Sequence, residues 1–384
     1  MTVYLDHNAT TPMAREVLEA MLPFLERRHG NPSSRHGRGR DARAAVDRAR
    51  EQVAALVKAR PSQVIFTSGA TEANNLALKG WSGGRPGARL AVGATEHPSV
   101  LSPALALRQH GCALGMLAVD SQGRIVSEAL EEALAEGAGL VSVMLANNET
   151  GVIQDLCAIS ELAHERGALV HTDAAQAAGR IEVDFEACGA DMMSLSAHKL
   201  SGPAGTGALV VGKTVDLEPL IHGGGQEHGL RAGTENVAAI VGFGAAAELA
   251  LRRGRDAQVE LRALRDYLEL RLGQLPGAVI FACDAPRLPN TVFLALPGLE
   301  GETVVMLLDE DGIAVSSGSS CSSGASEPSH VLMAMGVEPE VARCAVRVSL
   351  GPGNTRADID TLIAALEKHL YHLEAMPAGF LAAS

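Results

Sequence analysis

The 384-residue chain contains few aromatic residues and fewer positive than negative charges. Phe, Trp and Tyr make up 3% of the residues, so few rings are available to stack on nucleic-acid bases. Lys and Arg number 32 against 45 Asp and Glu, and the resulting formal net charge of −13 repels a phosphate backbone. These shortages predict that the protein has no nucleic-acid partner.

Long hydrophobic runs are also missing. The most apolar stretch, residues 237–251, is too short to span a bilayer and contains Glu248. The first residues carry neither the basic nor the apolar part of a secretory signal. We therefore expect no membrane association and a cytoplasmic location.

The six cysteines form no CxxC pair, and their spacing indicates neither a disulfide framework nor a zinc site. Five of them lie in apolar or helical surroundings and are predicted to be small core residues. Cys321 differs, because residues 316–326 around it are rich in Ser and Gly and offer it no apolar neighbour. This context favours a reactive thiol, and incidental exposure is the alternative.

Apolar segments alternate with helical patterns through most of the chain, which predicts an α/β fold with a mostly parallel sheet. The pattern changes near residue 255. We predict a large domain at 12–255 and a smaller α/β domain from 1–11 and 256–384, which carries the Cys321 segment. Strands are expected at 3–5, 64–66, 89–92, 140–145, 168–171, 192–195, 207–211, 278–281, 291–296 and 345–350, and helices at 72–79, 127–135, 156–166, 237–251, 258–272 and 303–309.

Lys199 is the most informative residue. It follows the predicted strand 192–195, and Asp173 ends the neighbouring predicted strand. Ligands bind at the carboxyl ends of strands in such sheets. Pyridoxal phosphate needs this pair, a lysine for the Schiff base and a carboxylate that keeps the ring nitrogen protonated. The pair therefore predicts a pyridoxal-phosphate enzyme, although a lone lysine is more commonly a solvated surface charge.

Other polar residues fall at the same predicted edge of the sheet. Residues 67–75 follow a strand and open a helix, so free N–H groups there suit a phosphate, unless the segment is an ordinary capped turn. His97 is expected to stack on the cofactor ring and move protons, although a lone histidine at a strand end is more commonly a structural residue. Asn148 and Gln176 are expected to bind the ring's phenolic oxygen, and Ser196 and His198 to add phosphate contacts.

Two residues are candidates for substrate contacts. Arg347 alternates with apolar residues on a predicted strand, where its guanidinium suits a substrate carboxylate. The alternative for Arg347 is a surface ion pair. Asn31 lies in a polar turn at 31–34 that could contact a ligand or be a plain turn. A metal cluster of His97, Asp173 and other histidines fits no standard ligand spacing.

These residues belong to ordered motifs through which the chain resembles cysteine desulfurases of the NifS/IscS type, in the class V aminotransferase group. The resemblance covers almost the whole length and implies the pyridoxal-phosphate-dependent transferase fold, similar to aspartate aminotransferase. The motifs are residues 4–12, 30–34, 68–75, 95–97, 147–151, 173–176, 196–199, 223–226 and 230–234, the Cys321 segment, residues 327–330 and Arg347.

The resemblance implies a role for each matched position. Lys199 would form the Schiff base, and Cys321 would attack the sulfur of L-cysteine to leave alanine and an enzyme persulfide. That sulfur would pass to acceptor proteins, such as an iron–sulfur scaffold. Thr234 would reach the phosphate in the other subunit of a homodimer, and Cys321 would transiently ligate an iron–sulfur cluster. The implied cofactor contacts are Ala70, Thr71, His97, Asn148, Asp173, Gln176, Ser196, His198, Lys199 and Thr234, and the implied substrate contacts are Arg347, Asn31 and Asn148.

The chain departs from the family pattern at Ala204, His228 and Ser320. These departures leave the partner surfaces and the pathway open, whether nitrogen fixation or housekeeping. A selenocysteine lyase that does not need Cys321 is an alternative enzyme. A non-catalytic assembly scaffold is the alternative outside enzymes.

Overall fold

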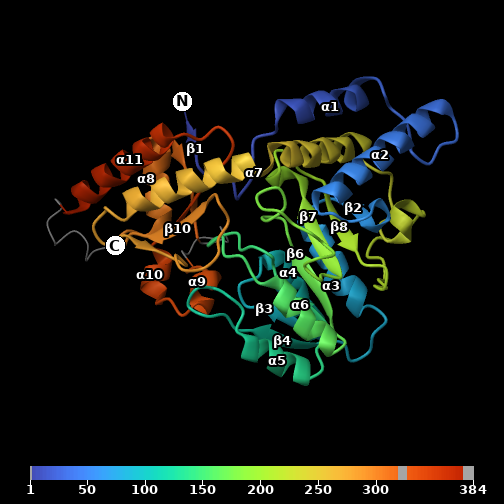
Figure 1. Cartoon of the computed structure of the whole chain (residues 1–384), viewed down its shortest axis with the longest axis horizontal. Coiled ribbons are helices and arrows are strands. Elements are labelled where there is room, and N and C mark those ends of the chain that lie inside the picture. The colour runs from blue at the N-terminus through green and yellow to red at the C-terminus, as the bar shows by residue number, and fades with distance from the viewer. Residues whose placement is uncertain (1, 319–326, 375–384) are drawn as a thin grey trace.

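The computed structural model describes residues 2–318 and 327–374 of the chain. Two lobes lie side by side in Figure 1, and the helix α7 (Val237–Leu272) runs across both. Within α7 the backbone leaves helical geometry at Gly254 (φ 53°, ψ −149°), a conformation that glycine adopts without a Cβ clash. The two helices expected at 237–251 and 258–272 are therefore present on either side of a kink at Gly254, and the label α7 covers both.

The larger lobe is built on a seven-stranded sheet, confirming the mostly parallel sheet expected from the sequence. Its strand order is β2-β8-β7-β6-β5-β3-β4. The strands from β7 to β4 are parallel, and β8 is antiparallel to both of its neighbours. The strands are β2 (Val64–Thr67), β3 (Arg89–Gly93), β4 (Ala113–Leu117), β5 (Leu140–Ser142), β6 (Leu169–Asp173), β7 (Met192–Ser196) and β8 (Gly207–Val211).

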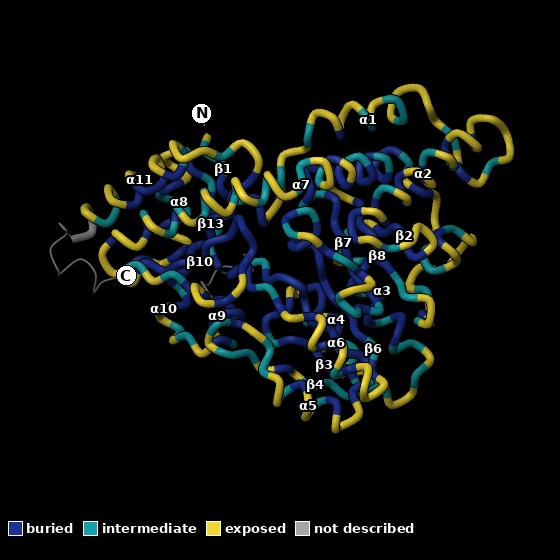
Figure 2. The backbone as a smooth tube through the Cα atoms, in the orientation of Figure 1, coloured by how far each residue is buried: buried dark blue, intermediate teal, exposed yellow. Residues whose placement is uncertain are grey.

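Helices cover this sheet, and its central strands are among the most deeply buried segments in Figure 2. Strand β7, for example, is buried at all five positions. Such complete burial explains why these strands read as continuous apolar runs in the sequence. The helices of this lobe are α1 (Arg15–Glu26), α2 (Gly37–Leu56), α3 (Ala70–Ser82), α4 (Pro98–Gln109), α5 (Ser127–Ala135), α6 (Leu156–Glu165) and short 3-10 turns η1 (Pro61–Gln63), η2 (Ala197–Lys199) and η3 (Gln226–Gly229).

The smaller lobe has a four-stranded antiparallel sheet in the order β12-β13-β10-β9. The N-terminal strand β1 pairs in parallel with β11, so the first residues join this lobe as expected. The exact division at residue 255 remains a proposal. The elements are β1 (Val3–Tyr4), β9 (Val279–Ile280), β10 (Thr291–Ala295), β11 (Ile313–Ala314), β12 (Ser316–Ser317), β13 (Ala345–Ser349), α8 (Gly301–Glu310), α9 (His330–Ala334), α10 (Pro339–Arg343) and α11 (Arg356–Glu374).

The expectation of five core cysteines is wrong for two of them. Cys157 and Cys283 are exposed, whereas Cys344 is buried and Cys112 and Cys188 are half-buried. Cys157 lies on α6, whose inward face is formed by positions 156, 159, 160 and 163, so position 157 turns towards solvent.

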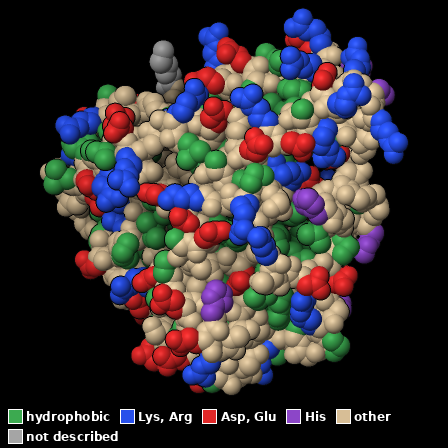
Figure 3. Space-filling model, turned by 45° about the vertical axis from the view of Figure 1, so that its right-hand side comes forward, with side chains coloured by type: hydrophobic (Ala, Val, Ile, Leu, Met, Phe, Trp, Pro, Cys, Tyr) green, Lys and Arg blue, Asp and Glu red, His purple; other side chains and the backbone are tan. Residues whose placement is uncertain are grey.

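Acidic, basic and apolar side chains are interspersed over the face of the molecule shown in Figure 3. Among the residues that the structure describes, no helix combines the length and the apolar character needed to cross a membrane.

Candidate functional site

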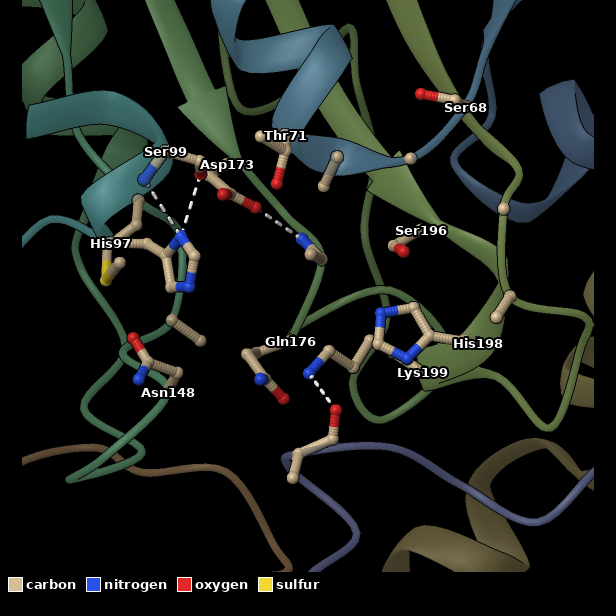
Figure 4. Close-up of a pocket in the computed structure, with 18 residues that line it drawn as sticks. Ser68, Thr71, His97, Ser99, Asn148, Asp173, Gln176, Ser196, His198 and Lys199 are labelled. Atoms are coloured by element: carbon tan, nitrogen blue, oxygen red, sulfur yellow. Dashed lines mark hydrogen bonds between the residues drawn. The ribbon is translucent and has the colours of Figure 1, made fainter. Parts of the chain in front are cut away.

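A cavity of about 440 Å³ lies at the carboxyl ends of β3, β5, β6 and β7. Figure 4 shows that polar side chains from several elements point into it. The structure thereby brings together most of the residues expected to bind a cofactor. Its lining includes Ala70, Thr71, His97, Asn148, Asp173, Gln176, Ser196, His198 and Lys199 from the sequence prediction, and also Ala9, Ser68, Gly69, Ser99, Ala204 and Gly205.

Lys199 ends the short turn η2, which directly follows β7. Its Nζ donates hydrogen bonds to the backbone carbonyls of Ala9, at 2.7 Å, and of Asn8. Burial, together with the positive charges of Arg180 and Arg347, lowers the pKa of Lys199 from 10.5 to about 7. A substantial fraction of the amine is therefore neutral near neutral pH, as a nucleophile requires.

Asp173 ends β6 and is buried, with 7% of its surface exposed. Its Oδ1 accepts a hydrogen bond from the backbone N–H of Ala175 at 2.9 Å, and its Oδ2 accepts one from Nδ2 of Asn74 at 2.7 Å. Two donors thus hold the carboxylate in one orientation at the cavity wall. Sequence reasoning missed Asn74, although an amide on the buried face of α3 was an available signal.

His97 is the N-cap residue of α4, and its ring lies beside Asp173 in Figure 4. The backbone N–H of Ser99 donates to Nδ1 of His97 at 3.1 Å, so Nδ1 is the acceptor and the neutral ring carries its proton on Nε2. Burial lowers the pKa of His97, Asp173 opposes this change, and Lys199 and His330 add to it. A neutral imidazole at this position can accept or relay a proton.

Ser99 connects His97 to Asp173 through Asn74. The Ser99 hydroxyl lies 2.8 Å from Nδ1 of His97, and it accepts a hydrogen bond from Nδ2 of Asn74 at 2.8 Å. The same Nδ2 reaches Asp173. Neither Ser99 nor Asn74 was singled out in the sequence, because their importance comes from a contact between α3 and α4.

The other end of the cavity suits an anion. Helix α3 begins at Ala70, where N–H groups of the first turn have no partner within the helix, and Figure 4 shows Thr71 and Ser196 nearby. A Cβ on Gly207 would lie 2.7 Å from Cα of Gly69, so only glycine lets β8 approach this turn so closely. Backbone N–H groups and hydroxyls around an open volume fit the phosphate of pyridoxal phosphate.

His198 and Gln176 are held by neighbouring groups. Burial lowers the pKa of His198 to about 4, and the charges of Lys199 and Arg180 contribute, so its ring is neutral at pH 7. The amide of Gln176 donates to the carbonyl of Asn8 at 3.0 Å and accepts a hydrogen bond from Arg180. Nδ1 of His198 also lies 3.1 Å from the hydroxyl of Thr10, so both side chains would meet a ligand in a defined orientation.

Arg347 lies behind the cavity wall instead of lining it. Its Nη1 donates to the backbone carbonyl of Asn148 at 3.1 Å, and its Nη2 pairs with Oδ1 of Asp6 at 2.7 Å. The alternative of a surface ion pair is wrong, because Arg347 is only 7% exposed and its ion pair with Asp6 is partly buried. Its substrate role remains a prediction.

Three predicted residues lie elsewhere. Asn31 is exposed in a turn, where its Oδ1 accepts from the N–H of Ser33, and Thr234 is exposed as well; neither lines the cavity. Cys321 lies outside the described residues, and with it the suggested iron–sulfur ligand. No group of three or more His, Cys, Asp or Glu side chains within residues 2–318 and 327–374 is placed to hold a metal ion.

The described residues that flank Cys321 in the sequence, up to residue 318 and from residue 327, contact groups next to the site. Ser316 on β12 pairs with Arg347 on β13, which brings the chain beside the carboxylate-binding candidate. On the other side, the Ser329 hydroxyl donates to Oε2 of the buried Glu149 at 2.5 Å. His330 contacts the backbone carbonyl of Glu96 at 2.9 Å.

Comparison with known proteins agrees with this geometry. The family model described as aminotransferase class-V matches residues 3–362. A cysteine desulfurase of Cereibacter sphaeroides is 47% identical over 378 residues, which cover 97% of each chain. A solved "NIFS-like protein" is 38% identical with a TM-score of 0.91, covering 97% of this chain and 100% of the other.

A second solved structure, described as "SspA in complex with cysteine", is 35% identical with a TM-score of 0.81. It covers 92% of this chain and 100% of its own. The matches extend over nearly the whole length, and the cavity carries the lysine, carboxylate and anion site that pyridoxal phosphate requires. The chain belongs to the class-V aminotransferase family, among its pyridoxal-phosphate-dependent cysteine desulfurases of the NifS/IscS type.

Proposed function

We propose that the chain converts L-cysteine and the Cys321 thiol into L-alanine and a Cys321 persulfide. The observation that carries the proposal is Lys199, whose pKa of about 7 leaves a neutral amine in the same cavity as the fixed carboxylate of Asp173. When bound, pyridoxal phosphate supplies an electron sink for the substrate carbon. Asp173 would hold the ring nitrogen, where its negative charge would favour the protonated ring.

The residues that line the cavity would bind the cofactor and transfer protons. Lys199 would anchor the cofactor, and its neutral amine would accept the proton from the substrate Cα. His97 would stack on the ring, and because Ser99 occupies Nδ1, its imidazole would give or take back a proton at Nε2. The first turn of α3, with Thr71 and Ser196, would hold the phosphate.

Sulfur transfer requires a thiol that reaches the cavity. The C–S bond of cysteine breaks, an S–S bond to Cys321 forms, and the substrate carbon takes a proton, so no external oxidant or reductant is needed. The described ends of the Cys321 segment support this role, since Ser316 pairs with Arg347 and Ser329 bonds to Glu149. Arg347 holds the substrate carboxylate, and the related structure of SspA with cysteine supports this class of substrate.

The proposal extends to the partners and the compartment. A persulfide is short-lived unless an acceptor takes the outer sulfur, so an acceptor protein such as an iron–sulfur scaffold is expected. Thr234 is exposed and lies away from the cavity of its own chain, which is compatible with a contact to the phosphate in the partner of a homodimer. Thiol chemistry of this kind is preserved in a reducing cytoplasm.

The test is single-turnover release of alanine from L-cysteine by cofactor-loaded protein, followed by release of sulfide when an added thiol reductant reduces the persulfide. Wild type should form one alanine per active site, and Cys321→Ala should form almost none. Cys157→Ala removes an exposed thiol on α6 and should behave as wild type. Equal alanine from the wild type and Cys321→Ala would remove Cys321 from the reaction.

Turnover of selenocysteine distinguishes a cysteine desulfurase from the alternative enzyme, a selenocysteine lyase. A selenocysteine lyase would keep selenocysteine turnover after Cys321→Ser, whereas a desulfurase would lose cysteine turnover. A scaffold without catalysis would show neither turnover nor the cofactor absorbance near 400 nm that a protonated Schiff base gives.

A further inference from the structure

The guanidinium of Arg347 already has a carboxylate partner inside this chain. Its Nη2 lies 2.7 Å from Oδ1 of Asp6, and the two side chains are 8% and 17% exposed. Its Nη1 donates to the carbonyl of Asn148 at 3.1 Å. Its Nε is buried and has no hydrogen-bond partner among the described residues, so the fork is only partly used.

Asp6 is held in place by its backbone. It follows β1, forms a bridge with Ser349 on β13, and its carbonyl accepts a hydrogen bond from the Tyr4 hydroxyl at 3.0 Å. The residues that come next face the cavity, because the carbonyls of Asn8 and Ala9 hold Lys199. The Asp6 carboxylate therefore lies between the small-lobe strand that carries Arg347 and the chain segment that borders the cofactor cavity.

A second carboxylate cannot join this pair without an electrostatic cost. A guanidinium binds one carboxylate through two parallel N–H donors, and two carboxylates on one guanidinium repel each other. Burial strengthens that repulsion because little water screens it. An amino-acid carboxylate arriving at Arg347 must share the guanidinium with Asp6 or displace it.

We propose that Asp6 is a specificity-determining residue, an internal competitor that weakens the binding of amino-acid carboxylates to Arg347. This inference rests on the proposed function, in which Arg347 receives the carboxylate of cysteine and of product alanine. Competition by Asp6 weakens the binding of the product alanine, so alanine dissociates more readily. When no ligand is present, the Asp6 carboxylate neutralises the charge of the buried guanidinium. If Asp6 had only a structural role, its replacement would instead weaken the binding of every ligand to a similar extent.

The experiment compares wild type with Asp6→Asn as cofactor-loaded protein. L-alanine binding is followed by the cofactor absorbance, and propionate, a carboxylate without an amine, by competition. Ethylamine, an amine without a carboxylate, is the control ligand, because it has no group for Arg347 to bind. Removal of a charged partner predicts dissociation constants at least about tenfold lower for L-alanine and propionate, with ethylamine unchanged within about twofold.

Two results would overturn the inference. Unchanged or weaker carboxylate binding by Asp6→Asn, with ethylamine unchanged, means that Asp6 does not compete. Weaker binding of all three ligands means that Asp6 has only a structural role. Asp6→Ser provides the same comparison should Asp6→Asn fold poorly, and circular dichroism with cofactor content checks both variants.

Two further variants separate this inference from the proposed function. Asp360→Asn neutralises a half-exposed aspartate that pairs with Arg271 on the small lobe, and it should leave all three dissociation constants unchanged. Arg347→Lys should weaken L-alanine and propionate but not ethylamine. Wild-type affinities in Arg347→Lys would overturn the role of Arg347, and with it the competition, while cysteine turnover by the wild type would still support the desulfurase activity.

Discussion

Asn74 offers a sharp test of how the site is held together. Its side chain is fully buried, and Nδ2 donates to Oδ2 of Asp173 at 2.7 Å and to the hydroxyl of Ser99 at 2.8 Å. Asn74→Ala removes both bonds. A hydrogen bond to a charged group contributes about 1.5–3 kcal/mol and a neutral one about 0.5–1.5 kcal/mol, so we expect the free energy of unfolding to fall by about 2–4.5 kcal/mol.

Asn74→Asp provides a second perturbation with a pH signature. It keeps the shape of the side chain but replaces the donating NH2 with a carboxylate oxygen beside Asp173. At pH 8 both carboxylates are charged and repel each other, whereas at pH 5 uptake of one shared proton restores a donor. We therefore expect Asn74→Asp to be more destabilised, relative to wild type, at pH 8 than at pH 5.

Urea unfolding of cofactor-free protein, followed by circular dichroism, measures the stability, and an absorbance titration measures cofactor affinity. Asn74→Ala should bind pyridoxal phosphate at least about tenfold more weakly, because Asp173 loses one of its two donors. Asn75→Ala is the control on the same helix, where the exposed amide bonds only to the carbonyl of Thr71, and it should change stability by no more than about 0.5 kcal/mol. Equal stability and cofactor affinity in the two alanine variants would refute the reasoning.

Two other expectations concern buried charge. The folded pKa of Lys199, about 7, lies below its ordinary value of 10.5, so the unfolded chain binds more protons between these pH values. The stability of cofactor-free protein should therefore rise between pH 7 and 10.5, by at most about 1.4 kcal/mol per pH unit from this group, and cofactor capture should reach half its maximal rate near pH 7. A half-maximum near pH 10 would contradict the lowered pKa. Glu227 forms a buried ion pair with Arg50 at 2.6 Å, and Glu227→Gln leaves that arginine unpaired, so urea unfolding should show a loss of about 3–5 kcal/mol. Glu182→Gln breaks an exposed pair with Lys58 and should cost less than about 1 kcal/mol, and similar losses from both variants would refute the distinction.

The sequence by itself determined the fold class and the position of the cofactor site. Runs of buried strands alternate with helical patterns, and a parallel sheet places the ends of its strands at one edge. Lys199, Asp173 and His97 could therefore be assigned to one cavity from their places after predicted strands. These assignments depend on local pattern and on the chemistry of single residues, which a sequence displays directly.

Where the local sequence pattern is weak, the prediction missed one strand and the exposure of two cysteines. Strand β4 was missed because it is an edge strand with half-exposed residues and a glycine at 115, so it lacks the apolar run of the central strands. The exposure of Cys157 and Cys283 was also missed, since neighbouring apolar residues do not reveal which face of an element meets the core.

Only the tertiary structure decided which distant polar groups meet. Asn74 joins Ser99 to Asp173, the carbonyls of Asn8 and Ala9 hold Lys199, and Asp6 pairs with Arg347 across 341 positions of the chain. Each of these contacts joins separate elements, and hydrogen bonds of this kind depend on positions within a fraction of an ångström. Residue order and hydrophobic period specify the elements, but packing of the whole chain sets the distances between them.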